Sequence, residues 1–131
     1  MAGSVDGDGD GGDEDSAESL VRAYYRALDD HEYGTLESLL EPAFTQRRPD
    51  RTFEDREAFV RFMREDRPMT DTSHEVLAVI VGSGDGDENG AENRVAVQGR
   101  LLDGSGDAVF RFADVFTLED GRIRRLETYT Q

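Results

Sequence analysis

The sequence predicts an α+β fold, because its periodicity changes from helical to strand-like about halfway along the chain. In the first half, apolar residues recur at the three- and four-residue spacing of amphipathic helices. From about residue 72 onward, apolar and polar residues alternate with a period of two, and glycine-containing turns interrupt that alternation. Helices first and hairpin-connected strands afterwards are typical of an α+β domain.

Three helices and one short strand are predicted in the first half. The first helix begins at residue 15 or 16, where Asp15 and Glu18 form a pair resembling a capping box. The second covers about residues 33–41, and Pro42 ends it. A brief strand at 43–47 follows, and the third helix runs from about 54 to 65, with its apolar side chains on one face.

Four long strands are predicted in the second half, at 72–81, 94–102, 108–118 and 122–130. The last three are separated by Asp103-Gly104-Ser105-Gly106 and by Glu119-Asp120-Gly121, which are hairpin-turn sequences. The predicted order is therefore α-α-β-α-β-β-β-β, and the strands form an antiparallel meander.

The chain contains one predicted domain, residues 16–131. Residues 1–15 are mostly Gly and Asp, too polar to bury a core, so we predict a disordered acidic tail. A similar run at 82–92 lies between two predicted strands and is interpreted as an acidic, solvated loop insert.

Composition restricts the partners and the environment. The net charge is −15, all 15 basic residues are arginine, and there is no cysteine, so disulfides and thiolate metal sites are excluded. A strongly acidic chain is a poor match for nucleic acid or for anionic membranes, and neither partner is expected. No secretory signal or membrane-length apolar run is visible, which predicts a cytoplasmic protein. The acidic, lysine-free composition resembles that of proteins from extreme halophiles, and the alternative is an ordinary acidic protein from a GC-rich genome.

Asp114 is the most informative residue in the sequence. In the predicted strand 108–118, strict alternation puts Asp114 on the same face as Phe110, Phe112 and Phe116, which must face the core. A buried carboxylate has to be paired, hydrogen-bonded or protonated. Four interpretations follow: an ion pair with an inward arginine such as Arg100, a protonated hydrogen-bond donor to a ligand, a general base in a dry cavity, or a structural group without chemistry.

Three segments resemble the nuclear transport factor 2-like superfamily, which includes SnoaL-like polyketide cyclases and ketosteroid isomerase. They are "LVRAYYRALDDHEYGTLESLLEPAF", "FEDREAFVRFMRE" and "FADVFTLEDGRIRRLETYT". The resemblance covers residues 16–131 and implies a cone of three helices and a curved sheet around a pocket. Asp114 matches the oxyanion-hole aspartate of ketosteroid isomerase, which the acid–base literature treats as a reference case, and Tyr24 or Tyr25 is near its oxyanion tyrosine. The stretch 45–49 lacks that enzyme's general-base carboxylate, so its steroid reaction is not expected.

The resemblance implies a site for a small apolar or carbonyl-containing molecule, without a cofactor or a metal. The catalytic candidates are Asp114, Tyr24 and His74, the last as a replacement base. The expected ligand contacts are Tyr25, Phe44, Gln46, Phe62, Met63, Gln98, Phe112, Phe116 and Thr128. Simple alternation puts Val95 and Val97 inward and Gln98 outward, but a register shift after the insert would reverse that.

Besides a regulatory or assembly domain attached to partners in trans, two function classes remain open at this point. One is a cofactor-free cyclase, isomerase or dehydratase that uses acid–base chemistry. The other is a non-catalytic ligand-binding or dimerisation module. The resemblance also implies a homodimer through the outer face of the sheet, where Arg111, Ala113, Val115, Thr117 and Tyr129 are expected.

Overall fold

The computed structural model describes residues 12–67, 71–82 and 92–131. In chain order the elements are α1 (Gly12–Asp29), α2 (Tyr33–Leu39), β2 (Leu40–Arg47), β3 (Thr52–Phe53), α3 (Arg56–Arg61), the π-helical turn η2 (Phe62–Asp66), β4 (Ser73–Gly82), β5 (Glu92–Leu102), β6 (Ala108–Glu119) and β7 (Arg122–Thr130). This order confirms the predicted α+β fold, with helices first and a strand meander last.

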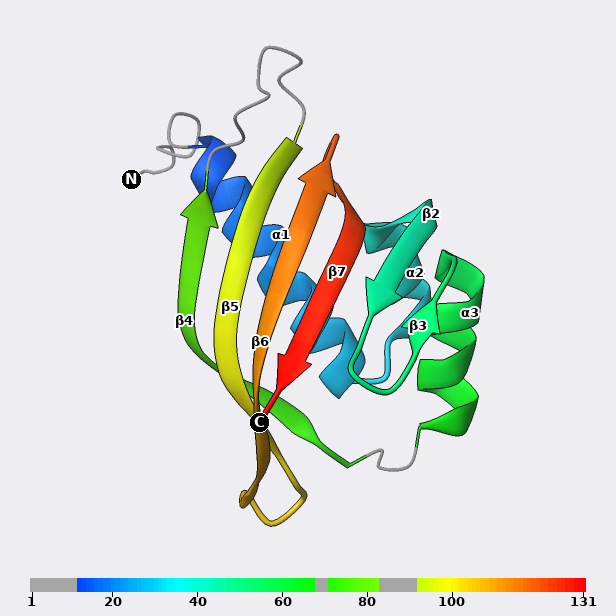
Figure 1. Ribbon diagram of the computed structural model, residues 1–131, viewed down its shortest axis with the longest axis vertical. Helices are drawn as coiled ribbons and strands as arrows, with labels where there is room; N and C mark the ends of the chain where they lie inside the picture. Colours follow the sequence, from blue (N-terminus) through cyan, green and yellow to red (C-terminus); the bar gives the residue numbers. More distant parts are fainter. Residues whose placement is uncertain (1–11, 68–70, 83–91) are drawn as a thin grey trace, which may run out of the picture.

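The described strands form one curved sheet in the order β3-β2-β7-β6-β5-β4. Strands β4 to β7 are an antiparallel meander, whereas β2 runs parallel to β7. Figure 1 shows α1 lying diagonally across one face of β4–β7, and α3 lying beside β2 and β3. The helices therefore cover one face of the sheet and leave the other face, here called the outer face, without a covering helix among the described residues.

Local sequence accounts for the main boundaries. The Asp55 side chain accepts a hydrogen bond from the Ala58 backbone N–H at 2.8 Å, which caps the N-terminus of α3. The β6–β7 turn contains Asp120 and Gly121 with φ of 54° and 80°, a left-handed pair that Asp and Gly tolerate best. These two devices fix the start of the third helix and the last hairpin.

The hydrophobic core lies between the helices and the inner face of the sheet. Phe44, Phe59 and Phe116 are fully buried, and Phe59 packs on Phe44 with ring centroids 5.1 Å apart. On β5 the valines face this core, with Val95 and Val97 at most 1% exposed. The alternation predicted for β5 is therefore present, without a reversal of the two faces.

Several boundaries differ from the predictions. Helix α1 begins at Gly12, so residues 12–15 belong to a helix and not to a disordered tail, while residues 1–11 lie outside the described part of the chain. Pro42 lies inside β2 at an irregularity in its pairing with β7, and the second helix already ends at Leu39. The two-residue strand β3 was not predicted. Gly82 and Glu92 end β4 and begin β5, and the rest of the predicted insert lies outside the described residues.

No helix among the described residues has the length and apolar character needed to span a membrane.

Candidate functional site

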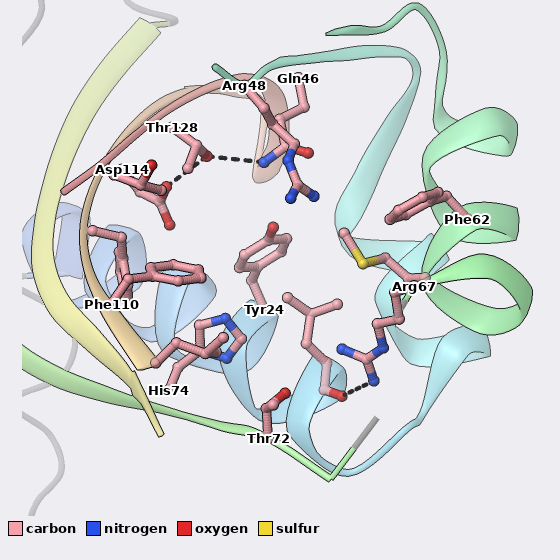
Figure 2. A pocket seen from close by; sticks show the side chains of 15 residues that line it. Tyr24, Gln46, Arg48, Phe62, Arg67, Thr72, His74, Phe110, Asp114 and Thr128 are labelled. Atoms are coloured by element: carbon pink, nitrogen blue, oxygen red, sulfur yellow. Dashed lines mark hydrogen bonds between the residues drawn. The ribbon is translucent and has the colours of Figure 1, made fainter. Parts of the chain in front are cut away.

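One pocket opens between the helices and the inner face of the sheet, with a cavity volume of about 190 Å³. Side chains from α1, β2, η2 and β4–β7 line it, as Figure 2 shows. The lining residues are Tyr24, Leu28, Gln46, Arg48, Phe62, Met63, Arg67, Thr72, His74, Leu101, Phe110, Phe112, Asp114, Thr128 and Thr130. The walls are largely apolar, and a few polar groups converge on the cavity, which is the usual composition of a small-molecule site.

Asp114 lies in the wall of this pocket and is only 5% exposed. The Tyr25 hydroxyl donates to its Oδ2 at 2.6 Å, and the Thr128 hydroxyl donates to its Oδ1 at 2.6 Å. Gln46 Nε2 in turn donates to Thr128 Oγ1 at 2.9 Å, so the Thr128 proton is directed to Asp114. Lengths near 2.6 Å are typical of hydroxyl donors to an ionised carboxylate.

Opposing effects act on the pKa of Asp114, and the rise caused by burial is the largest of them. Burial raises the pKa of the Asp114 carboxyl above its ordinary value, whereas the hydrogen bonds from Thr128 and Tyr25 and the positive charges of His74 and Arg48 lower it. No cation is within ion-pair distance of Asp114 among the residues described, so hydroxyl groups hold its charge. A carboxylate has about four lone-pair sites, and the two protein donors leave capacity for a ligand.

The Tyr24 hydroxyl points into the pocket and has no hydrogen-bond partner in the described part of the chain (Figure 2). Burial raises the pKa of Tyr24 well above its ordinary value and nearby Asp114 adds to that rise, while Arg48 and Arg67 oppose it. The hydroxyl therefore stays protonated at neutral pH and can donate a hydrogen bond to an oxygen atom of a ligand.

His74 is held by Asp29 from α1. Asp29 Oδ1 lies 2.7 Å from His74 Nδ1, and Asp29 Oδ2 accepts the His74 backbone N–H at 3.0 Å. A carboxylate at Nδ1 favours the tautomer that carries its proton there and leaves Nε2 as the basic nitrogen. The ring also packs on Tyr25 and Phe112, with centroids 5.1 and 5.6 Å away, so its orientation is fixed from three sides.

Two arginines approach the pocket, one from the end of strand β2 and one from the end of η2. Arg48, directly after β2, points its guanidinium group into the cavity, and its Nε lies 3.3 Å from the exposed Asp50. Arg67, directly after η2, donates from Nη2 to the Leu28 carbonyl at 3.3 Å and to Tyr33 Oη at 3.1 Å. The π-helical turn brings Arg67 here, because its backbone N–H bonds to the Phe62 carbonyl five residues earlier.

The structure brings most of the sequence-predicted candidates together. Asp114, Tyr24, His74, Gln46, Phe62, Met63, Phe112 and Thr128 all line the pocket. Tyr25 lies behind the wall and acts on the site through its hydrogen bond to Asp114 and its ring contacts with His74 and Phe112. Phe44 and Phe116 are fully buried core residues that do not line the cavity.

Two expectations about polar residues of β5 do not match the geometry. Gln98 is exposed on the outer face, because Val97 beside it faces inward, so Gln98 is not a ligand contact. Arg100 makes an ion pair with Glu75 and is not the partner of Asp114. The alternation of a strand is sufficient to exclude both from the inner face.

The sequence analysis missed Asp29, Arg67 and Thr72. Asp29 was hidden because it ends an amphipathic helix, where an acidic residue usually contacts solvent. Arg67 follows a helix whose last turn is unexpectedly π-helical. Among the described residues no group of three or more His, Asp or Glu side chains converges as metal ligands.

A curved sheet with helices on one face, which together enclose a largely apolar pocket with a few polar groups, is the architecture of a nuclear transport factor 2-like protein. The SnoaL-like domain family matches residues 21–126, and the chain belongs to that family. No curated protein matches the chain in sequence.

Solved structures show the same fold at low sequence identity. A putative polyketide cyclase from Sinorhizobium meliloti is 21% identical, with a TM-score of 0.68, over 86% of this chain and 97% of that one. A putative ketosteroid isomerase from Kribbella flavida is 22% identical, with a TM-score of 0.62, over 89% and 78%. A nuclear transport factor 2-like protein with a cystatin-like fold from Novosphingobium aromaticivorans is 16% identical, with a TM-score of 0.77, over 89% and 80%. At these identities the likeness establishes the fold alone.

Proposed function

We propose that this chain is a cofactor-free enzyme that moves protons on a small carbonyl compound, in an isomerase, cyclase or dehydratase type of reaction. The observation that supports this most directly is Asp114, a buried carboxyl group without a cationic partner that faces a pocket. A carboxyl group whose pKa is raised by burial acts as a base closer to neutral pH than an exposed one.

Three groups have distinct roles in this proposal. Asp114 accepts a proton from a carbon next to the carbonyl group, and the electron pair of that C–H bond forms an enolate. The Tyr24 hydroxyl donates a hydrogen bond to the enolate oxygen, which is where negative charge develops. His74, oriented by Asp29, takes up a proton from solvent at Nε2 and delivers it to the position where the product gains one, and the proton on Asp114 is returned to solvent.

The experiment that tests this proposal is exchange of carbon-bound protons in D₂O, followed by proton NMR on a panel of small ketones and oxo acids. Exchange reports enolisation directly and needs no knowledge of the product. We expect exchange with the wild type and its loss in Asp114→Asn, with a smaller loss in Tyr24→Phe. Tyr129→Phe, on the outer face, is the matched control and retains activity. Exchange that persists at the wild-type rate in Asp114→Asn would overturn the assigned role.

A non-catalytic ligand-binding role is the alternative, and the two protein hydroxyls that donate to Asp114, one to each carboxylate oxygen, favour it. In that case the carboxylate organises Tyr25, Thr128 and Gln46 into a rigid wall. The same panel separates the two proposals, because ligands then bind in wild type and no exchange follows.

We also propose that two copies of the chain associate through the outer face of the sheet. Ile80 is 66% and Tyr129 is 56% exposed there, although both are large apolar or aromatic side chains. Between them the cross-strand partners are small, with Ala96 opposite Ile80 and Ala113 opposite Tyr129. A sheet face with small side chains at its centre can pack on its own copy about a twofold axis.

The acidic, lysine-free composition supports a further part of the proposal, namely a cytoplasmic protein adapted to high salt. The described salt bridges are mostly exposed pairs, which are weak in dilute solution. High salt reduces the repulsion among the excess carboxylates over the whole surface.

A further inference from the structure

We propose that the ligand of the pocket is a small carboxylate-bearing molecule, whose carboxylate group binds between Arg48 and Arg67. This inference rests on the proposed small-molecule function and specifies the chemical class of the ligand. It assigns the recognition of the ligand to the two arginines and leaves the proton transfer to the opposite wall.

Arg67 is the first observation behind this inference. Five described arginines are not fully exposed, namely Arg48, Arg56, Arg67, Arg100 and Arg124. Four of them have an acidic partner, and Arg67 has none within the described part of the chain. Its Nε is also buried without a hydrogen-bond acceptor. The chain has twice as many acidic as basic residues, yet among the described residues Arg67 is a half-buried cation without an acidic partner, which suits an anion that arrives from outside.

Arg48 is the second observation. Within the described residues its acidic partner is Asp50, which is exposed and lies at the Nε edge of the guanidinium group. Figure 2 shows the other end of this group pointing into the cavity. The terminal nitrogens of a guanidinium group present two parallel donors, the geometry that fits a carboxylate.

The positive charges of both arginines act on the Tyr24 hydroxyl, which points into the pocket. Arg48 and Arg67 each lower the pKa of the Tyr24 hydroxyl, so both positive charges act where that hydroxyl donates. Tyr24 and Asp114 line the same pocket as the two arginines.

The volume of the pocket limits the size of the ligand. A cavity of about 190 Å³ holds about six water molecules at about 30 Å³ each. Pockets for drug-sized ligands measure about 300–1,000 Å³. The site therefore fits an acyclic or single-ring acid and not a steroid or a fused-ring polyketide.

Calorimetric titration tests the inference with oxo acids of four to six carbons, such as 2-oxobutanoate and 4-oxopentanoate, and with their methyl esters. We expect the acids to bind at least tenfold more tightly than the esters. Arg67→Gln and Arg48→Gln each reduce the affinity for the acids about tenfold or more and change that for the esters less than twofold. Arg47→Gln is the matched control, because Arg47 is the exposed neighbour of Arg48 on β2. Arg67→Lys keeps the charge and retains part of the affinity, and thermal melts verify folding of every variant.

The outcomes separate this inference from the proposed catalysis. Three outcomes would each overturn the carboxylate site. The esters could bind as tightly as the acids, or no acid in the panel could bind. The third is that Arg67→Gln and Arg48→Gln behave like Arg47→Gln. Proton exchange on neutral ketones without any preference for acids would overturn it and leave the enzymatic proposal intact. Selective binding of acids without proton exchange supports the carboxylate site and refutes the catalysis.

Discussion

Removing the Tyr25 hydroxyl should destabilise the protein by about 1.5–3 kcal/mol, the usual contribution of a hydrogen bond to a charged group. This hydroxyl donates to the buried Asp114 at 2.6 Å. The Tyr25→Phe change keeps the ring, which packs on Tyr24, His74 and Phe112 with centroids 5.1–5.7 Å away. The loss therefore reports the hydrogen bond and not the packing.

Urea denaturation at pH 7 measures this loss, and thermal melting gives a second readout at about 4 °C per kcal/mol for a chain of this size. A double-mutant cycle with Asp114→Asn isolates the pairwise term, because both residues belong to one network. We expect a coupling energy above about 1 kcal/mol, and no change in Tyr129→Phe. A coupling energy below about 0.5 kcal/mol would refute the view that hydroxyl donors hold a buried carboxylate at this position.

Three further predictions concern pH, salt and assembly. Burial raises the pKa of Asp114 in the folded state above its ordinary value of 3.8. The folded protein therefore holds this proton more tightly than the unfolded chain does. Because of this difference, ionisation of Asp114 lowers the free energy of unfolding as pH rises. The melting temperature of Asp114→Asn relative to wild type should therefore increase from pH 3.8 up to the folded pKa and then stay constant; a flat or falling difference contradicts this sign. The melting temperature of the wild type should rise between 0.1 and 2 M KCl, because the Debye length falls from about 10 Å to below about 3 Å and repulsion among the carboxylates weakens. A melting temperature that does not depend on salt would count against salt adaptation. Ala113→Arg on the outer face should convert a dimer to a folded monomer, as measured by sedimentation equilibrium. Ser105→Arg, in the β5–β6 turn, is the control and should leave the dimer intact. A dimer that persists in Ala113→Arg would place the interface elsewhere.

The long strands were predictable because their period-two pattern is local and their turns contain Gly. Each of β4 to β7 begins and ends within two residues of its predicted bounds. The inward position of Asp114 followed from the same alternation. By contrast, β3 has two residues, and its existence depends on pairing with β2, which no local pattern reports. The parallel pairing of β2 with β7 brings together segments about 80 residues apart and is equally invisible locally.

Only the site residues that lie on strands could be predicted, because the alternation of a strand determines which of its side chains face the pocket. Asp114, Thr128 and Gln46 follow from alternation together with the sheet order. Asp29 and Arg67 reach the pocket from the end of α1 and from the residue after η2, and their contribution depends on how helices dock on the sheet. Long side chains add to this difficulty, since a guanidinium group lies several bonds from its own backbone.

The charge of the whole chain and the charge of the pocket have opposite signs, and this gives a carboxylate ligand an unusual salt dependence. A net charge of −15 repels an approaching anion at long range, and salt removes that repulsion once the Debye length is short. Inside the pocket, Arg48 and Arg67 attract the same anion at contact distance, where salt screens less because the charges are partly buried. The association rate for 4-oxopentanoate should therefore increase between 0.1 and 2 M KCl, while the dissociation rate changes much less. Stopped-flow measurements separate the two rates. In Arg67→Gln the dissociation rate should be higher at every salt concentration, and the increase in association rate should remain. An association rate that falls with salt in the wild type would mean that the arginines, and not the acidic surface, control the approach of the ligand.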